Sequence, residues 1–423
     1  MQYSAVKGFK DILPDQVGVW NRIESEAKRV FELFGFREIR IPILEKADLF
    51  IRGIGQETDV VSKEMYTFQD RKGNYLAMRP EATASVLRAY IENKLFEGSA
   101  IQKLFTIGPM FRYERPQKGR RRQFHQINAE IIGDPGPRID SELVYMIMLF
   151  FSSLGINDIS LNINSLGCPV CREPFRIKLK DFLKDHYDEL CPDCQRRMDT
   201  NPLRVFDCKV KSCNEVMEDA PVMLDFLCDN CSSHFNKLMA DLKDLNVDFV
   251  INSHLMRGLD YYARTTFEVQ TKSLGAQNAI AGGGRYDGLI KELGGPDNPA
   301  IGFAIGMERV VELLNEYGLQ KGDNIDVFMI PLGREAEDRT FIWVQRLREA
   351  GIKCDMEYKS LGLKAQMRHA DRLNAKQVFI VGDDELGKGK GILRDMTTKE
   401  QFEIPLTDPV NEIMRIGKKV ENR

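Results

Sequence analysis

One group of charged and aromatic residues has the composition of a phosphate-binding site. Arg112 and Glu114 precede a basic loop over residues 115–122, and Phe124 and Gln126 follow it. Because alternate side chains of a strand point to one face, two paired strands would bring these four side chains together. The arginine could then hold a phosphate through two hydrogen bonds, and Phe124 could stack on a purine ring. The basic loop could contact a nucleic-acid backbone, although a solvated basic hairpin explains the same residues equally well.

The cysteines form a second group, with metal-binding spacing. Eight of the nine fall between Cys168 and Cys231, as three CxxC pairs and a looser pair, Cys208 and Cys213. Two CxxC pairs about twenty residues apart are typical of structural zinc. The expected ligands of one such site are Cys168, Cys171, Cys191 and Cys194. Buried reduced thiols and a redox function are the alternatives, and a disulfide framework is disfavoured in a long chain without a secretory signal.

A glycine-rich string late in the chain has the spacing of a phosphate-binding loop but not its chemistry. It reads Gly-Asp-Asp-Glu-Leu-Gly-Lys over residues 382–388, and Gly389 stands where a serine or threonine should bind Mg²⁺. The three acidic residues would repel a phosphate. We therefore expect a charged turn at this point.

Hydrophobic periodicity predicts the elements that position these residues. Apolar residues at three- and four-residue steps predict a helix over residues 16–35, and an alternating pattern predicts a strand over 36–43. Two further strands, over 103–111 and 124–132, form a long antiparallel hairpin around the basic loop.

Beyond the hairpin, the pattern divides the chain into three parts. Residues 165–240 are cysteine-rich and helical in pattern, as in an insertion, and residues 259–310 return to strands with a turn at the triple glycine 282–284. After a boundary near residues 321–324, strands alternate with helices, which predicts a small α/β domain. Further elements are helices over 80–90, 142–154, 340–350, 364–373 and 411–420, and strands over 326–331 and 377–381.

Composition excludes several classes of protein. The 423 residues are 43% hydrophobic and 29% charged with a net charge of −3, so the chain is no general polycation and must contact nucleic acid through local basic patches. It has neither an apolar signal segment nor a run of eighteen apolar residues. We expect a cytoplasmic protein of two to four domains with no membrane partner.

Four strings of residues resemble the motifs of one enzyme family. Residues 112–126 resemble motif 2 of class II aminoacyl-tRNA synthetases, in the form that the histidyl family has, and residues 302–309 resemble motif 3. Arg-Gly-Leu-Asp-Tyr-Tyr at 257–262 and Ala-Gly-Gly-Gly-Arg-Tyr-Asp-Gly at 281–288 resemble two motifs specific to the histidyl family. The resemblance runs from about Lys7 to the C-terminus.

This resemblance implies a ligase that joins L-histidine to tRNA(His), through a histidyl-adenylate made from ATP with release of pyrophosphate. The implied fold is α/β (α+β), with a mainly antiparallel sheet in a class II catalytic domain over residues 1–323. The helical insertion over 165–240 belongs to that domain, and an α/β domain over 324–423 should bind the anticodon arm. A homodimer is also implied, with residues 16–43 near the interface.

The resemblance carries histidine-binding roles onto several residues. Glu81 should receive the α-amino group of histidine with Thr83 beside it, because a carboxylate attracts an ammonium group. The alternative for Glu81 is a carboxylate that stabilises a helix N-terminus. The expected lining of the imidazole pocket is Gln126, Glu130, Tyr262 and Tyr286. Such a pocket rejects side chains that leave its polar groups unpaired.

The resemblance also implies how ATP and tRNA are held. Arg112 and Arg257 should flank the α-phosphate, where charge develops during in-line attack by the histidine carboxylate, and Mg²⁺ should bridge the β- and γ-phosphates. The other expected ATP contacts are Glu114, Phe124 and Arg309. Arg115 and Gln117 are the candidates for contact with the tRNA acceptor end. Many family members lack the cysteines described above, so a zinc ion there would not be needed for the chemistry.

Two rival functions use the same fold. One is a non-catalytic, histidine-sensing regulatory subunit, a type of relative that usually lacks the C-terminal domain and some reactive arginines. This chain keeps Arg112, Arg257 and Arg309 together with the extra domain, which disfavours that rival. The other rival is a synthetase for another amino acid, and the two histidyl-specific strings argue against it.

Overall fold

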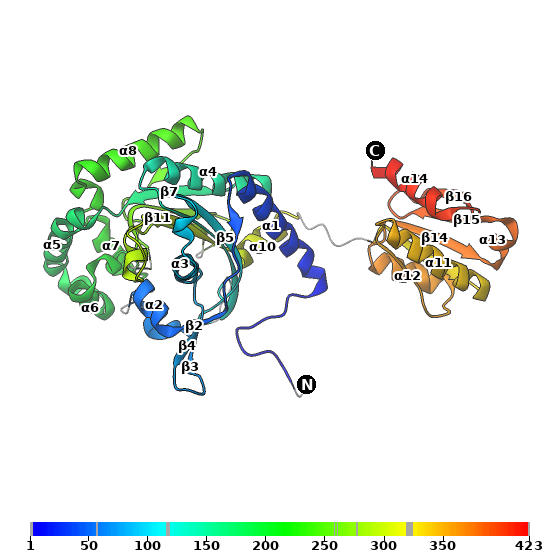
Figure 1. Cartoon of the computed structure of the whole chain (residues 1–423), viewed down its shortest axis with the longest axis horizontal. Coiled ribbons are helices and arrows are strands. Elements are labelled where there is room, and N and C mark those ends of the chain that lie inside the picture. The colour runs from blue at the N-terminus through cyan, green and yellow to red at the C-terminus, as the bar shows by residue number, and fades with distance from the viewer. Residues whose placement is uncertain are drawn as a thin grey trace. The chain divides into compact units, whose positions relative to one another are not determined.

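The chain forms two compact units (Figure 1), one of Met1–Ile12 with Trp20–Leu319 and one of Leu13–Val19 with Gln320–Arg423. The computed structural model describes residues 3–55, 58–115, 119–257, 259, 261–275, 278–318 and 325–421. No helix within these ranges is both long enough and apolar enough to cross a membrane.

An eight-stranded, mostly antiparallel sheet forms the centre of the first unit, as the sequence predicted. Its strands, in spatial order, are β1 (Arg37–Glu38), β5 (Gln102–Phe111), β6 (Gln123–Ile132), β11 (Ala300–Gly306), β10 (Ala279–Arg285), β9 (Ala263–Gln270), β7 (Ser160–Ser165) and β8 (Val250–Ile251). Only the edge pairs β1–β5 and β7–β8 are parallel. β5 and β6 form the predicted hairpin, with Gln102 opposite Ile132 and Phe111 opposite Gln123. A separate three-stranded sheet contains β2 (Leu44–Lys46), β4 (Tyr75–Met78) and β3 (Thr67–Gln69).

Two long helices cover the large sheet through a cluster of phenylalanines. Phe31 of α1 (Pro14–Leu33) lies 5.6 Å from Phe105 of β5 and 5.8 Å from Phe303 of β11, measured between ring centroids. It also lies 5.9 Å from Phe150 of α4 (Pro137–Ser153). Both helices were predicted, and each begins earlier than expected. The other helices around the sheet are α2 (Ala47–Ile54), α3 (Thr83–Glu92), α9 (Leu289–Glu292) and α10 (Met307–Glu316).

The predicted insertion is helical. Its helices are α5 (Pro169–Asp185), α6 (Pro192–Thr200), α7 (Lys211–Glu218) and α8 (Asp229–Asp244), with short 3₁₀ turns at Tyr187–Glu189, Pro202–Val205 and Met223–Phe226. These helices gather beyond the β7 side of the sheet (Figure 1, green). Their buried side chains form one hydrophobic cluster with Tyr262 and Tyr286 of the catalytic motifs, so the insertion packs directly behind that part of the sheet.

The second unit is the predicted small α/β fold. Its sheet contains, in spatial order, β13 (Cys354–Met356), β12 (Val327–Leu332), β14 (Gln377–Gly382), β15 (Lys390–Asp395) and β16 (Gln401–Pro405). Its helices are α11 (Arg334–Glu349), α12 (Leu363–Arg372), α13 (Asp383–Lys388) and α14 (Pro409–Glu421). β13, β12 and β14 run parallel, and β14, β15 and β16 are antiparallel.

Three local predictions are wrong. The strand expected over residues 36–43 shrinks to β1, and farther along this segment the carbonyls of Ile41 and Pro42 accept from the Arg79 guanidinium, at 2.8 and 3.3 Å. The triple glycine lies inside β10 and makes no turn. The charged turn expected over residues 382–388 is the short helix α13. Gly382 N, at the N-cap of this helix, donates to a carboxylate oxygen of Glu385 at 2.9 Å.

Candidate active site

A cavity of about 280 Å³ in the first unit collects most of the predicted site residues. It is lined from β6, β9, β10 and β11, from the beginnings of α3 and α10, and from the segment before β9. The predicted residues that line it are Glu81, Thr83, Arg112, Glu114, Phe124, Gln126, Arg257, Tyr262 and Arg309. Residues as far apart in the chain as Glu81 and Arg309 therefore share one cavity, whose volume is near the lower end of small-molecule sites.

The hairpin brings its four predicted side chains to this cavity. Phe124 and Gln126 lie on β6, opposite Met110 and Gly108 of β5, and Arg112 and Glu114 follow the end of β5. Arg112 Nε donates to the carbonyl of Pro80 at 2.9 Å, which fixes the guanidinium next to the start of α3. The same guanidinium lies 5.3 Å from the Phe124 ring centroid. A flat ligand ring and a phosphate could thus be held side by side.

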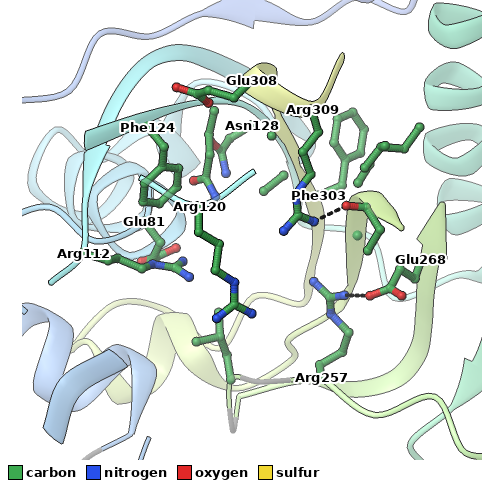
Figure 2. Close-up of a pocket in the computed structure, with 18 of the residues that line it drawn as sticks. Glu81, Arg112, Arg120, Phe124, Asn128, Arg257, Glu268, Phe303, Glu308 and Arg309 are labelled. Atoms are coloured by element: carbon green, nitrogen blue, oxygen red, sulfur yellow. Dashed lines mark hydrogen bonds and ion pairs between the residues drawn. The ribbon is translucent and has the colours of Figure 1, made fainter. Parts of the chain in front are cut away.

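Guanidinium groups from three parts of the chain point into the cavity (Figure 2). Arg112 and Arg120 come from the hairpin region, Arg257 from the segment before β9, and Arg309 from α10. Arg257 Nη1 lies 3.2 Å from a carboxylate oxygen of Glu268, and Arg309 donates to the carbonyl of Ala279. Convergent arginines of this kind suit a ligand with several negative charges.

Glu81 holds the N-terminus of α3 and also faces the cavity. Its two carboxylate oxygens accept the backbone N–H groups of Thr83 at 2.7 Å and Ala84 at 2.8 Å. Burial raises the pKa of Glu81, and these two hydrogen bonds oppose that rise. These contacts confirm that Glu81 stabilises the helix N-terminus, and each carboxylate oxygen keeps a second lone pair that can accept from a ligand ammonium.

Glu130 and Tyr286 do not line the cavity but lie behind its wall. Glu130 accepts a hydrogen bond from Thr83 Oγ1 at 2.8 Å and another from the Tyr286 hydroxyl. Burial raises the pKa of Glu130 to about 8 despite these two donors. Thr83, which does line the cavity, links this buried pair to any ligand.

Some buried polar atoms near the cavity have no partner. Among the described residues, Gln126 Oε1, Asn128 Oδ1 and Arg257 Nε find no hydrogen-bond partner in the protein. All three residues line the cavity. Since buried polar groups are nearly always paired, these atoms are the ones that a bound ligand or water would satisfy.

Among the lining residues that the sequence did not single out are Glu268, Arg120 and Tyr261. Glu268 pairs with Arg257, Arg120 lies 3.2 Å from Glu114, and the Tyr261 ring is 4.6 Å from that of Tyr262. Tyr261 belongs to the same motif as Tyr262, and Glu268 is the one acidic residue of β9. Both could therefore have been predicted as site residues. Arg120 was one of several equivalent arginines in the basic loop, and no pattern distinguished it.

The residues proposed for tRNA contact lie outside the cavity lining or outside the described ranges. Arg115 is exposed just beyond the hairpin strand, and Gln117 lies outside the described residues. Arg121 joins Arg120 in the cavity wall. The basic loop therefore contributes to the cavity itself as well as to the surface.

The cysteines group differently from the predicted set. Cys168 and Cys171 meet Cys228 and Cys231, whereas Cys191 and Cys194 meet Cys208 and Cys213. The expected single site of Cys168, Cys171, Cys191 and Cys194 is therefore wrong. The N-terminal ends of α5 and α8 meet at the first group, and α6 and α7 contribute to the second, so nearness in the chain does not decide the partners.

Comparisons with known proteins agree on one family. A family model described as Histidyl-tRNA synthetase matches residues 8–168 and 199–310, and one described as Anticodon binding domain matches residues 326–416. The chain is 54% identical over 404 residues to a histidine–tRNA ligase of Desulfosudis oleivorans, which covers 95% of this chain and 96% of that protein. It is 51% identical over 412 residues to one from Desulforapulum autotrophicum, with 97% of each chain covered. The crystal structure of apo S. aureus histidyl-tRNA synthetase aligns with a TM-score of 0.81 at 35% identity, over 97% of this chain and 99% of that one.

Proposed function

Since this chain belongs to the histidyl-tRNA synthetase family, we propose that it ligates L-histidine to tRNA(His). Histidine and ATP first form histidyl-adenylate and pyrophosphate, and the terminal ribose of the tRNA then takes the histidyl group. The observation that carries this proposal is the meeting of Arg112, Arg257 and Arg309 in one cavity beside Glu81.

In the first step, the histidine carboxylate attacks the α-phosphorus of ATP in line with the leaving pyrophosphate. Arg112 and Arg257 hold the α-phosphate from two sides, because negative charge that develops on its oxygens is stabilised by cations already in position. Arg309 holds the adenine and the γ-phosphate. Phe124 stacks on the adenine, and Glu114 accepts from its amino group. Two such fixed arginines lower the barrier without any rearrangement during the reaction.

The donor set of the cavity suits Mg²⁺. The carboxylates of Glu114 and Glu308 line it, and Mg²⁺ prefers oxygen ligands from carboxylates, water and phosphates. Glu308 would hold the ion, because Glu114 is assigned to the adenine amino group. When bound, Mg²⁺ would neutralise part of the phosphate charge.

Selection for histidine follows from polar groups that need partners. Glu81 binds the α-ammonium group. Thr83 lines the cavity beside it, and its hydroxyl is held in place by the hydrogen bond to Glu130. Gln126 and Tyr262 supply polar groups toward the imidazole, which has two ring nitrogens to pair. A side chain without those nitrogens would leave Gln126 Oε1 unpaired in a buried place, which costs about 1–3 kcal/mol.

In the second step, the tRNA reaches the cavity along the basic loop, where Arg115 and Gln117 contact its acceptor end. The catalytic domain spans residues 1–323 with the insertion at 165–240, and residues 324–423 bind the anticodon arm. We place the enzyme in the cytoplasm as a homodimer, with residues 16–43 near the two-fold axis.

The test is ATP–pyrophosphate exchange with each of the twenty amino acids in turn. We expect exchange with histidine alone, followed by charging of tRNA(His) when tRNA is added. Exchange with another amino acid would assign a different substrate to the same machinery. Binding of histidine without any exchange would favour the regulatory-subunit rival, since such a protein needs no reactive arginines.

A further inference from the structure

Eight cysteines of the insertion form two separate four-sulfur clusters. Cluster A contains Cys168, Cys171, Cys228 and Cys231. Cluster B contains Cys191, Cys194, Cys208 and Cys213. Within each cluster, all four sulfur atoms lie within 4.8 Å of one another. The ninth cysteine, Cys354, is buried in the second unit and belongs to neither cluster.

The sulfur separations fit one ion at the centre of each cluster. Cys168 Sγ lies 3.6 Å from Cys171 Sγ and 3.9 Å from Cys228 Sγ, and Cys191 Sγ lies 3.8 Å from Cys208 Sγ. Four thiolates arranged tetrahedrally at about 2.3 Å from zinc would be about 3.8 Å apart. A disulfide instead needs its two sulfurs at about 2.05 Å. Several bridged iron atoms would need the four sulfurs farther apart than a single ion does.

Helix N-termini hold the cysteines in a setting that favours thiolates. Cys168, Cys191 and Cys228 occupy the N-cap positions of α5, α6 and α8. Cys213 lies in the first turn of α7. The positive end of a helix dipole and its unpaired first-turn N–H groups stabilise negative charge on nearby sulfur.

Backbone hydrogen bonds connect the two halves of each cluster. Cys228 N donates to Cys171 Sγ at 3.1 Å in cluster A, and Cys191 N donates to Cys213 Sγ at 3.2 Å in cluster B. In each case the donor belongs to one pair of cysteines and the acceptor to the other. Such bonds orient ligand sulfurs and spread their charge, as outer-shell groups do in metal sites.

We propose that each cluster binds one zinc ion in a closed tetrahedral Cys₄ site, so that the chain carries two structural zinc ions. Four protein ligands leave no open position for a substrate. None of the eight cysteines lines the proposed catalytic cavity. The zinc of cluster A links the beginning of α5 to the beginning of α8, and that of cluster B links α6 to α7. The two ions therefore hold the helices of the insertion together and take no part in the ligase reaction.

The first experiment measures metal content. The full chain is produced with zinc in the medium, purified without chelators, and analysed for zinc and iron by mass spectrometry. We expect about two zinc ions per chain and negligible iron. Less than about 0.1 zinc per chain, or iron in place of zinc, would overturn the proposal.

Matched variants assign the ions to the clusters. Cys171→Ser should lose about one zinc by removing a ligand of cluster A, and Cys194→Ser should lose about one by removing a ligand of cluster B. Cys354→Ser is the control and should keep about two, since Cys354 belongs to neither cluster. Retention of both ions by Cys171→Ser and Cys194→Ser would contradict the assignment.

A second measurement on the wild-type chain avoids reliance on variants that fail to fold. A mercurial reagent that attacks thiolates is titrated into the protein while a colorimetric dye reports free zinc. Hydrogen exchange is followed in the same samples. We expect release of about two zinc ions and faster exchange in α5–α8, with exchange in β12 and β14 unchanged. Zinc release without any change in α5–α8 would remove the structural role. Neither readout depends on ligase activity, so this inference and the proposed function can fail separately.

Discussion

Arg257 illustrates how charge is arranged in the cavity at the scale of single residues. Its guanidinium pairs with Glu268 at 3.2 Å and lies 5.4 Å from the Tyr262 ring centroid, yet its Nε has no partner among the described residues. The pair with Glu268 keeps the side chain in place before a ligand arrives. A phosphate can then take the remaining donors, which supports the role at the α-phosphate that the family resemblance implies for Arg257.

Removal of that cation should lower the rate of the first step. Arg257→Ala should reduce histidine-dependent ATP–pyrophosphate exchange by at least about a hundredfold, with the thermal unfolding temperature little changed. Arg339→Ala is the matched control, because Arg339 is exposed, pairs with Glu335 on α11 and does not line the cavity. In Arg257→Ala/Glu268→Gln, a partial recovery would show that part of the loss comes from the uncompensated carboxylate. Wild-type exchange in Arg257→Ala would remove the catalytic role.

Glu130 should make stability depend on pH. Burial raises its pKa from 4.5 to about 8, so the folded protein binds this proton more tightly than the unfolded chain does. The stabilisation is complete below pH 4.5 and is lost as pH rises through about 8. Between these limits, wild type should lose up to about 1.4 kcal/mol per pH unit relative to Glu130→Gln, which cannot ionise.

Unfolding temperatures of the two proteins between pH 5.5 and 8.5 would test this expectation. Glu349→Gln, a substitution at an exposed position of α11, serves as the control and should follow wild type. Parallel curves for wild type and Glu130→Gln across the whole range would mean that Glu130 is ionised in the folded protein throughout.

At the scale of elements, β10 contains glycines because neighbouring groups come too close to leave room for a side chain. A Cβ atom at Gly283 would lie 2.2 Å from the carbonyl oxygen of Gly302 on β11, so only glycine fits between the strands there. A Cβ atom at Gly282 would lie 2.3 Å from Nη1 of Arg257. The first contact involves backbone that cannot move, whereas the second involves the end of a flexible side chain.

These two glycines should therefore respond differently to alanine. Gly282→Ala should displace Arg257 and lower histidine-dependent exchange roughly tenfold or more, with little loss of stability. Gly283→Ala should lower the free energy of unfolding by about 1–3 kcal/mol or more. Gly98→Ala is the control, since its Cβ would come no closer than 3.7 Å to any atom outside its neighbours and its φ is −88°. Chemical denaturation and exchange assays on the three variants separate the two effects, and equal losses of stability at 282 and 283 would contradict this account.

At the scale of the whole molecule, a net charge of −3 means that tRNA must be attracted by local groups. We expect the apparent affinity for tRNA in aminoacylation to fall steeply with salt concentration, while histidine-dependent exchange changes much less over the same range. Arg115→Ala should lower the slope of log KM for tRNA against log salt by about one, if Arg115 contacts a phosphate. Arg71→Ala, another exposed arginine, should leave that slope unchanged. A salt dependence equal in both assays would argue against recognition by phosphate contacts.

Features that depend on local pattern could be predicted from the amino-acid sequence. The hydrophobic periodicity that predicted α1, β5 and β6 is a property of each segment alone. The motif strings likewise identified the family without any knowledge of contacts. Arg112, Phe124 and Arg309 were found in the same way and do line one cavity.

Contacts between distant segments could not be predicted, because they depend on how the elements pack. Cys171 groups with Cys228 and not with Cys191, because the N-terminal end of α8 meets that of α5, and chain spacing does not show this meeting. Glu130 lies behind Thr83 and not in the cavity wall. This position follows from the packing of α3 against β6, which the sequence does not show. The triple glycine forms part of a strand because β11 and Arg257 approach it closely. A single segment of sequence does not show those neighbours.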